Sequence, residues 1–344
     1  MRRFRLPESR IFRLLLVLVP IAGLVLLAIW RGPDSGLLER AFRAVEWEWV
    51  AVAVLINLFS VIVRSHAWYI VVKQSIPPPW PRRRSVFSAF CVGLLGNAAL
   101  PGRVGELARV AVIARHVRRR PGTWATIVGT VFAHRLFDVV VAVALVLFTL
   151  YVAPIPDWAM PVLAVVIGVG LGLLIAGFAL ARKHRRPLSE ELGPLRRMLH
   201  MARHGLTVLR RPRPAVEALF FQTVGWVAQL FAVYTAFLAF SIDATVPEAA
   251  LVLVIMNLVM VFPFWPGNVG LVQAAVAAAL LSYGVSYAHG ILFGIGLQAI
   301  EVSVGVGLGF LFLAREGFTF AMLKRMPEMT DVDVNEDERV ERIA

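Results

Sequence analysis

Charged side chains stand at two places where the surrounding sequence is apolar. The string PGRVGELAR places Arg103, Glu106 and Arg109 directly after a Pro-Gly break. Arg135 and Asp138 stand three residues apart inside a later apolar run. Residues three apart share one helix face, so each acid can pair with the arginine on its own helix. Arginines held in this way can bind a phosphate group while the acids orient them.

Each of these groups also has a purely structural explanation. Arg103 and Arg109 can be ordinary positive residues that flank a membrane segment, and Arg135–Asp138 can be a structural ion pair. Burying a charged group in a bilayer costs about 2.5–3.5 kcal/mol on insertion scales, so such a group must pair or face a cavity. His134 can titrate near neutral pH and take part in proton coupling, or it can simply pack between helices.

A second Pro-Gly break, PGNVGLVQA, lies in the other half of the chain and offers the uncharged polar residues Asn268 and Gln273. Paired Pro/Gly interruptions in the two halves of a polytopic protein indicate a transporter's binding site. A half-helix that starts after the first break would point free N–H groups at an anion. Glu301, inside the last apolar run, must also find a partner, for which an arginine of the first half is a candidate. Like His134, Glu301 is also a candidate for ion coupling.

The elements that position these residues must be membrane helices. Hydrophobic residues make up 59% of the 344 residues and charged residues 17%, and the mean hydropathy is +0.75. The net charge of +13 comes from Lys and Arg clustered between apolar runs, which is typical of cytoplasmic loops. We therefore expect no nucleic-acid partner. The single cysteine, Cys91, excludes an intrachain disulfide, and no metal-site spacing or cofactor motif is present.

Apolar runs predict an all-α polytopic membrane protein with six transmembrane helices and two re-entrant helical hairpins. The hairpins, at about 85–117 and 249–283, contain the two breaks, and each has similar flanks at both ends. Basic flanks place the first hairpin on the cytoplasmic side, and flanks without Lys or Arg place the second outside, as in an inverted repeat. The six predicted spans are Leu14–Trp30, Trp49–Val72, Thr123–Tyr151, Pro161–Ala181, Ala215–Phe240 and Ile291–Leu313.

These elements form one membrane-embedded domain over residues 1–326. The loop 182–214 is strongly basic and therefore cytoplasmic; it is either solvated or lies on anionic lipid headgroups. Residues 327–344 are acidic and poor in aromatic residues, which predicts a disordered cytoplasmic tail. With an N-terminal basic anchor, both termini are expected in the cytoplasm.

The motifs resemble the family of the lysylphosphatidylglycerol synthase transmembrane region, also called flippase-like integral membrane proteins. The resemblance covers about residues 10–320 and rests on N-x-x-L-P-G-R-x-G-E-x-x-R from Asn97, R-L-x-D from Arg135 and P-G-x-x-G. It implies a lipid translocator of the bacterial inner membrane with Asn97 in its substrate site. The chain has no room for the synthase domain of the bifunctional relatives, so we expect it not to make lysyl-lipid. The resemblance also implies partner proteins of envelope-lipid biosynthesis.

Two departures from the family pattern bear on the headgroup. Gln273 stands where the family often has a glutamate, and His134 stands where a glutamate commonly precedes R-L-x-D. If those acids bind a cationic headgroup or couple an ion, this chain prefers another lipid.

Two functions remain open from the sequence. The first is a lipid flippase in which Arg103, Arg109 and Arg135 hold a phosphate-bearing headgroup in a polar slot between the hairpins, and the repeats rock to move it across. The second is an intramembrane enzyme, or an accessory subunit of an envelope lipid- or glycan-modifying complex, because Glu106 and His134 could cluster with Asp138. No soluble-enzyme motif occurs in the sequence.

Overall fold

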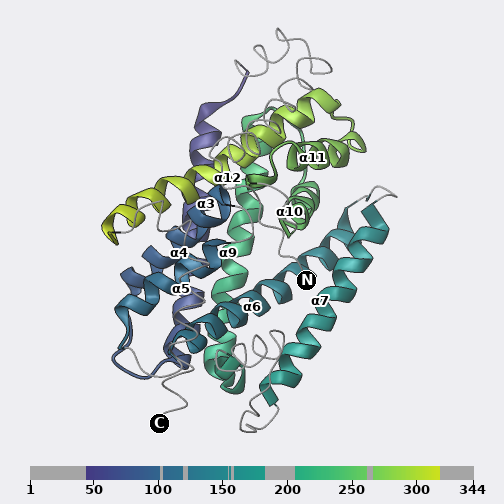
Figure 1. Cartoon of the computed structure of the whole chain (residues 1–344). Coiled ribbons are helices and arrows are strands. Elements are labelled where there is room, and N and C mark those ends of the chain that lie inside the picture. The colour runs from purple at the N-terminus through teal and green to yellow at the C-terminus, as the bar shows by residue number, and fades with distance from the viewer. Residues whose placement is uncertain are drawn as a thin grey trace, which may run out of the picture.

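The computed structural model describes residues 44–100, 104–118, 123–153, 155, 159–182, 206–261 and 266–317, and all regular elements in these ranges are helical (Figure 1). Five helices are long and apolar enough to cross a membrane, which confirms five of the predicted spans. The predicted span Leu14–Trp30, most of the basic loop and the tail 327–344 lie outside the described residues. The five helices are Trp47–Ser75 (α3), Thr123–Val152 (α6), Ala159–Arg182 (α7), Pro212–Ala239 (α9) and Tyr287–Arg315 (α12).

The sequence explains where several of these helices begin and end. Helix α3 ends at Ser75, just before a run of three prolines that cannot continue a helix. Helix α9 begins with Pro212, whose missing N–H would have no helical partner in the first turn. Helix α12 begins after Ser286, whose hydroxyl accepts a hydrogen bond from the backbone N–H of His289 at 3.3 Å.

Two helical hairpins lie at the predicted breaks. The first consists of Arg83–Ala99 (α4) and Val104–His116 (α5), and the second of Val246–Val261 (α10) and Leu271–Leu281 (α11). A 3-10 turn, Pro266–Asn268 (η3), precedes α11. All four helices are shorter than the spans described above, and the helices within each hairpin pack on one another. The re-entrant placement of these hairpins in the bilayer stays a prediction.

The described helices form two runs of four with matching lengths. Helices α3, α4, α5 and α6 contain 29, 17, 13 and 30 residues. Helices α9, α10, α11 and α12 contain 28, 16, 11 and 29 residues. Each run is therefore long, short, short, long, and we call the two runs the first and the second repeat. Helix α7 lies between them in the sequence and packs on α6.

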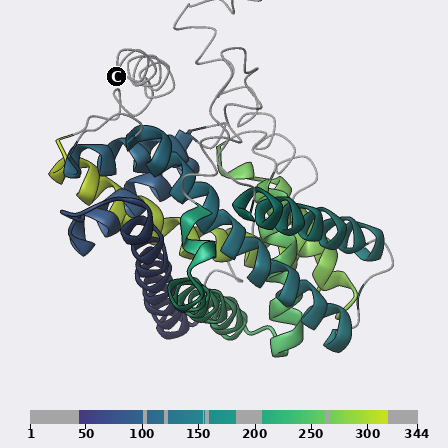
Figure 2. The ribbon, with the colours of Figure 1, turned by 90° about the horizontal axis from the view of Figure 1, so that it is seen from below.

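The two repeats run in opposite directions. The backbone N–H of Glu46, at the start of α3, donates to the carbonyl of Ala239 at the end of α9, at 2.9 Å. At the other end of the pair, Arg211 Nη1 donates to Gln74 Oε1 at 3.1 Å. Helices α3 and α9 therefore lie side by side and antiparallel along their length, with one hairpin on either side of them (Figures 1 and 2). This is the arrangement of an inverted repeat.

The contacts between the two repeats are also symmetrical. Helix α12 of the second repeat packs on α4 of the first, and α6 of the first repeat packs on α10 of the second. Helix α4 also contacts η3, so the first hairpin reaches the break of the second. Two large clusters of buried apolar residues fill the space. One consists mainly of residues of α3, α4, α5 and α6 with contributions from α9 and α12, and the other mainly of residues of α9, α10, α11 and α12 with contributions from α3 and α6.

Helices α4 and α5 touch backbone to backbone at Gly105. A Cβ atom added there would lie 1.9 Å from the carbonyl oxygen of Gly93 and 2.6 Å from the backbone nitrogen of Asn97. Backbone atoms cannot move away cheaply, so only glycine permits this approach. The close contact holds Glu106, the next residue, at a fixed height against α4.

We expect Gly105→Ala to destabilise the protein by about 1–3 kcal/mol, because the added methyl group must push α5 away from α4. The change is measured as a fall in the unfolding temperature of the purified protein in detergent. Gly168→Ala is the matched control, since a Cβ at Gly168 on α7 would meet nothing within 4 Å. Equal unfolding temperatures for the two variants would show that the α4–α5 contact is not tight.

The end of the predicted basic loop is partly helical and packs against the membrane helices. Leu206–Arg210 forms a 3-10 helix (η2), and α9 already begins at Pro212, although the loop was expected to reach 214. Val208 of η2 is fully buried, and η2 packs against α3, α6, α7 and α9. An apolar side chain in this short segment anchors it to the helices, so the last part of the loop belongs to the folded domain.

Candidate functional site

A chain of charged side chains links the first hairpin to the long helices of the first repeat. Arg135 on α6 donates from Nη2 to the Glu106 carboxylate on α5, and from Nη1 to Asp138 Oδ2 at 3.0 Å. Arg109 forms a second ion pair with Glu106. Both predicted local pairs are therefore present. Arg135 also joins them into one cluster, so Arg109 and Arg135 both contact the carboxylate of Glu106.

Asp138 is the centre of the other half of the cluster. Its Oδ1 atom accepts from Arg64 Nη2 of α3 at 3.3 Å, from Trp226 Nε1 of α9 at 3.0 Å, and from Gln222 of α9. Its other oxygen accepts from Arg135. One carboxylate thus holds three helices together, and it carries the charge network from the first repeat into the first helix of the second.

The cluster contains one guanidinium more than it has carboxylates. Glu106 has Arg109 as a partner, Asp138 has Arg64, and Arg135 is shared by both acids. Oppositely charged neighbours stabilise each acid in its ionised form. With these pairings the site carries excess positive charge, which an anion can neutralise.

The three arginines differ in their access to the surroundings. The Arg109 side chain is 4% exposed, with its guanidinium carbon 4.8 Å from the ring centroid of Trp68. The Arg64 side chain is 16% exposed, and that of Arg135 is 38% exposed. Arg135 is therefore the most accessible of the three, while Arg109 is held in the core by its acid and an aromatic ring.

The second repeat contains a corresponding network of amides. Gln229 Nε2 of α9 donates to Glu301 Oε1 of α12 at 2.9 Å, and Gln229 Oε1 accepts from Arg64 Nη1 at 3.2 Å. Gln273 of α11 donates to Gln298 of α12, which in turn donates to the carbonyl of Gly267 in the break. These bonds tie the second hairpin to α12.

Other predicted site residues serve internal contacts. Gln273 Oε1 also accepts from the backbone N–H of Gly270 at 2.6 Å, and Asn268 Nδ2 donates to the carbonyl of Val259 at 2.8 Å. Both side chains are buried and close the break between α10 and α11. Asn97 Nδ2 lies 3.5 Å from Glu106 Oε1. Arg103 lies outside the described residues, so its place in the site stays a prediction.

His134 does not join this network through hydrogen bonds. Its side chain is 1% exposed, and neither ring nitrogen has a hydrogen-bond partner among the described residues. The ring meets Phe90 edge to face with centroids 5.9 Å apart. The cluster of Glu106, His134 and Asp138 suggested for an enzyme therefore forms no direct bond to the imidazole in the described part of the chain.

Sequence reasoning missed Arg64, Trp226 and the central place of Gln222 and Gln229. Arg64 is a lone arginine inside a predicted span, so the cost of burying a charge in a bilayer was a sufficient signal. Both glutamines donate to acids on other helices. Asn257, by contrast, donates to Leu253 of its own helix at 2.8 Å.

Glu301 also differs from the expectation. No ion pair to an arginine joins it within the described residues; its partner is the amide of Gln229. Arg64 is linked to it only through that amide. The same part of the chain contains no group of three His, Cys, Asp or Glu side chains arranged to hold a metal ion.

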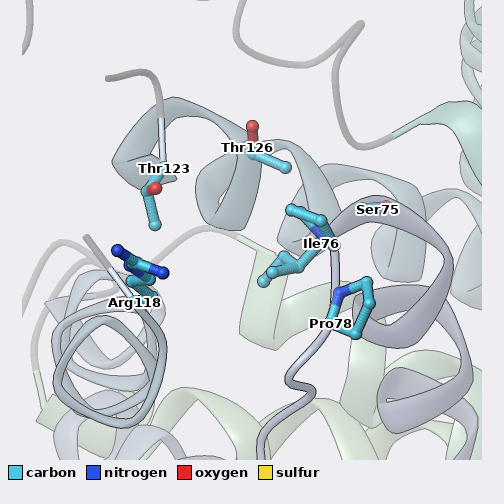
Figure 3. A pocket seen from close by; sticks show the side chains of 7 residues that line it. Ser75, Ile76, Pro78, Arg118, Thr123 and Thr126 are labelled. Atoms are coloured by element: carbon cyan, nitrogen blue, oxygen red, sulfur yellow. The ribbon is translucent and has the colours of Figure 1, made fainter. Parts of the chain in front are cut away.

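A pocket of about 140 Å³ lies apart from the charge cluster, at the ends of α3 and α5 and the start of α6. Figure 3 shows Arg118, Thr123 and Ile76 around it, with Thr126, Ser75 and Pro78 completing the labelled lining. This pocket lies among the residues that connect the membrane helices. The predicted slot between the two hairpins stays a prediction.

Comparisons with known proteins agree with this architecture. The family described as the lysylphosphatidylglycerol synthase TM region matches residues 10–309. A protein of Methanothermobacter thermautotrophicus named UPF0104 membrane protein is 22% identical over 277 residues, which cover 75% of this chain and 80% of that protein. No solved structure matches the chain.

Proposed function

Because the chain belongs to the family of the lysylphosphatidylglycerol synthase transmembrane region, we propose that this multi-pass membrane protein is a lipid transporter. It moves lipids with a phosphate-bearing headgroup between the two leaflets, and it is a translocator and not an enzyme. Following the positive-inside rule, we place it in the bacterial inner membrane with both termini in the cytoplasm. The basic segment 182–214 then faces anionic lipid headgroups.

One observation carries the proposal: three guanidinium groups meet two carboxylates, and the shared group is the most exposed. Arg135 can leave Glu106 without exposing an uncompensated acid, since Arg109 remains beside Glu106. It can also leave Asp138, because Arg64 remains there. A phosphate oxygen pair matches the guanidinium fork as well as a carboxylate does. Lipid phosphate can thus replace either acid at Arg135 at little electrostatic cost.

This exchange connects headgroup binding to movement of the hairpin. The bond from Arg135 to Glu106 ties α6 to α5, and the close α4–α5 contact makes the first hairpin follow α5. A phosphate that takes the place of Glu106 releases this tie. The acyl chains stay in the surrounding lipid, while the headgroup passes the point at which α4 contacts the second break.

The test is transfer of fluorescent phosphatidylglycerol in vesicles that contain the purified protein, followed by a quencher added outside. We expect Arg135→Ala to slow transfer about tenfold or more, because a charge-assisted bond contributes about 1.5–3 kcal/mol. Arg135→Lys keeps the charge without the fork and should retain an intermediate rate. Arg84→Ala, which removes an exposed arginine at the start of α4, is the matched control.

Labelled diacylglycerol, which has no phosphate, separates headgroup recognition from a general disturbance of the bilayer. Diacylglycerol moves quickly between the leaflets without a protein, and we expect neither the wild-type protein nor the two Arg135 variants to change its rate. Transfer of phosphatidylglycerol at the protein-free rate, or at equal rates in wild type and Arg135→Ala, would refute the proposal.

A further inference from the structure

Side chains of the two polar networks occupy equivalent places in the two repeats. Arg64 is the eighteenth residue of α3, and Gln229 is the eighteenth residue of α9. Asp138 is the sixteenth residue of α6, and Glu301 is the fifteenth of α12. Because α3 corresponds to α9 and α6 to α12, these are matching positions near the middle of matching helices.

The bonds between these residues correspond as well. In the first repeat, Arg64 donates to Asp138 across the α3–α6 contact; in the second, Gln229 donates to Glu301 across the α9–α12 contact. Each pair joins the first long helix of its repeat to the last. The second pair has kept its acid, but an amide has taken the place of the arginine.

A second pair of bonds follows the same pattern. Glu106 and Arg135 join the second half of the first hairpin to α6, and Gln273 and Gln298 join the second half of the other hairpin to α12. Here both charges are replaced by amides. The second repeat therefore copies the first with neutral groups at every position but one, and Glu301 is that exception.

Glu301 therefore differs from Glu106 and Asp138 in the charges that surround its carboxylate. Both of those acids contact two arginines, whereas Glu301 contacts none among the described residues. It stands at the centre of the 29-residue span α12, where an ionised carboxylate without a directly paired cation is costly. Arg64 is linked to it only through the amide of Gln229. Burial without a counter-charge favours the protonated acid.

We propose that Glu301 is a proton-binding site whose protonation state is coupled to lipid binding at Arg135. The proposal rests on the transport function above and adds an energy source to it. In its ionised form Glu301 balances the surplus positive charge of the first-repeat cluster. Once Glu301 binds a proton, that surplus is left for the lipid phosphate.

The coupling runs through a continuous row of hydrogen bonds. Glu301 accepts from Gln229, Gln229 accepts from Arg64, and Arg64 donates to Asp138. When Glu301 is neutral, it no longer attracts Arg64 through the amide of Gln229, so Arg64 interacts with Asp138 alone. Asp138 then competes less for Arg135, and Arg135 is freer to bind phosphate.

Among the described residues of the helices packed on α12, Arg64 is the charged group linked to Glu301. From α3 the group is Arg64, and from α9 it is Gln229, which is neutral. Helix α11 has no ionisable residue. Helix α4 has the buried thiol of Cys91 and, at its start, Arg83 and Arg84, which lie near the C-terminal end of α12. One proton adds to the Glu301 carboxylate and returns to water when the headgroup leaves; no other bond is made or broken.

The first experiment measures protonation without measuring transport. Infrared difference spectra of the protein in vesicles, recorded across about pH 5 to 9, should show the carbonyl band of a protonated carboxyl group that disappears as the pH rises. The band should be lost in Glu301→Gln and kept in Glu48→Gln, which changes an exposed glutamate at the start of α3. A band that persists in Glu301→Gln, or no titrating band in wild type, would overturn the inference.

The second experiment measures the coupling. A pH gradient across the vesicle membrane should change the rate of phosphatidylglycerol transfer by the wild type, and Glu301→Gln should lose this dependence while it still transfers lipid and keeps its unfolding temperature. If the wild type transfers lipid at a rate that ignores the gradient, the coupling is wrong and the transport function stands. If no lipid is transferred, or Arg135→Ala changes nothing, the transport function itself fails.

Discussion

Asp138→Asn is expected to lower the free energy of unfolding by about 3–5 kcal/mol, the range found when one partner of a buried ion pair is removed. The Asp138 side chain is 10% exposed and accepts bonds from four side chains on three helices. Asparagine keeps the shape but not the charge, so Arg64 loses its carboxylate and Arg135 is left with Glu106 alone. Trp226 and Gln222 can then donate only to the single amide oxygen of the asparagine.

Reversible unfolding in mixed detergent micelles measures this loss. Asp243→Asn is the control, because Asp243 is exposed in the segment between α9 and α10. The control should change the free energy of unfolding by less than about 0.5 kcal/mol. A similarly small effect for Asp138→Asn would mean that the cluster is open to water and holds no helices together.

Glu106→Gln is expected to cost about 3 kcal/mol, mainly through Arg109. The Arg109 guanidinium is almost fully buried against Trp68, and Glu106 is its ion-pair partner among the described residues. Arg135 is less affected, since Asp138 still holds it. The damage comes from a buried positive charge that has lost its acid.

This cause predicts rescue by a second substitution. Glu106→Gln/Arg109→Gln should unfold with a free energy about 2 kcal/mol higher than Glu106→Gln alone, because no unpaired charge remains. Gln273, which matches Glu106 in the second repeat, shows that a glutamine at this place can still join the hairpin to the last long helix. Additive losses in the double variant would place Arg109 in contact with water or with another acid.

Local spacing was enough to predict part of the site. The three-residue separations of Glu106–Arg109 and of Arg135–Asp138 place each pair on one helix face, and both pairs form. Hydropathy was enough for five spans, and the Pro-Gly strings located both hairpin breaks. Each of these features depends on residues close together in the sequence, where helix geometry alone determines the neighbours.

Contacts between distant residues could not be predicted in the same way. Arg135 meets Glu106 and Asp138 meets Arg64 only because α5, α6 and α3 pack as they do. The correspondence of Arg64 to Gln229 and of Asp138 to Glu301 cannot be recognised in the sequence, because the corresponding residues differ in type. It emerges only when helices of matching length are compared position by position.

The antiparallel pair of α3 and α9 has a consequence for the direction of the proposed transport. In a transporter with two identical inverted halves, a two-fold rotation would relate the inward-open and outward-open states, which would have equal energy and bind the cargo equally well from either leaflet. Here one half is lined with charges and the other with amides. For the proposed transporter we therefore expect two end states of unequal energy, with an affinity for a phosphate headgroup that differs between the leaflets. Breaking the symmetry of a duplicated fold gives such a machine a preferred loading side.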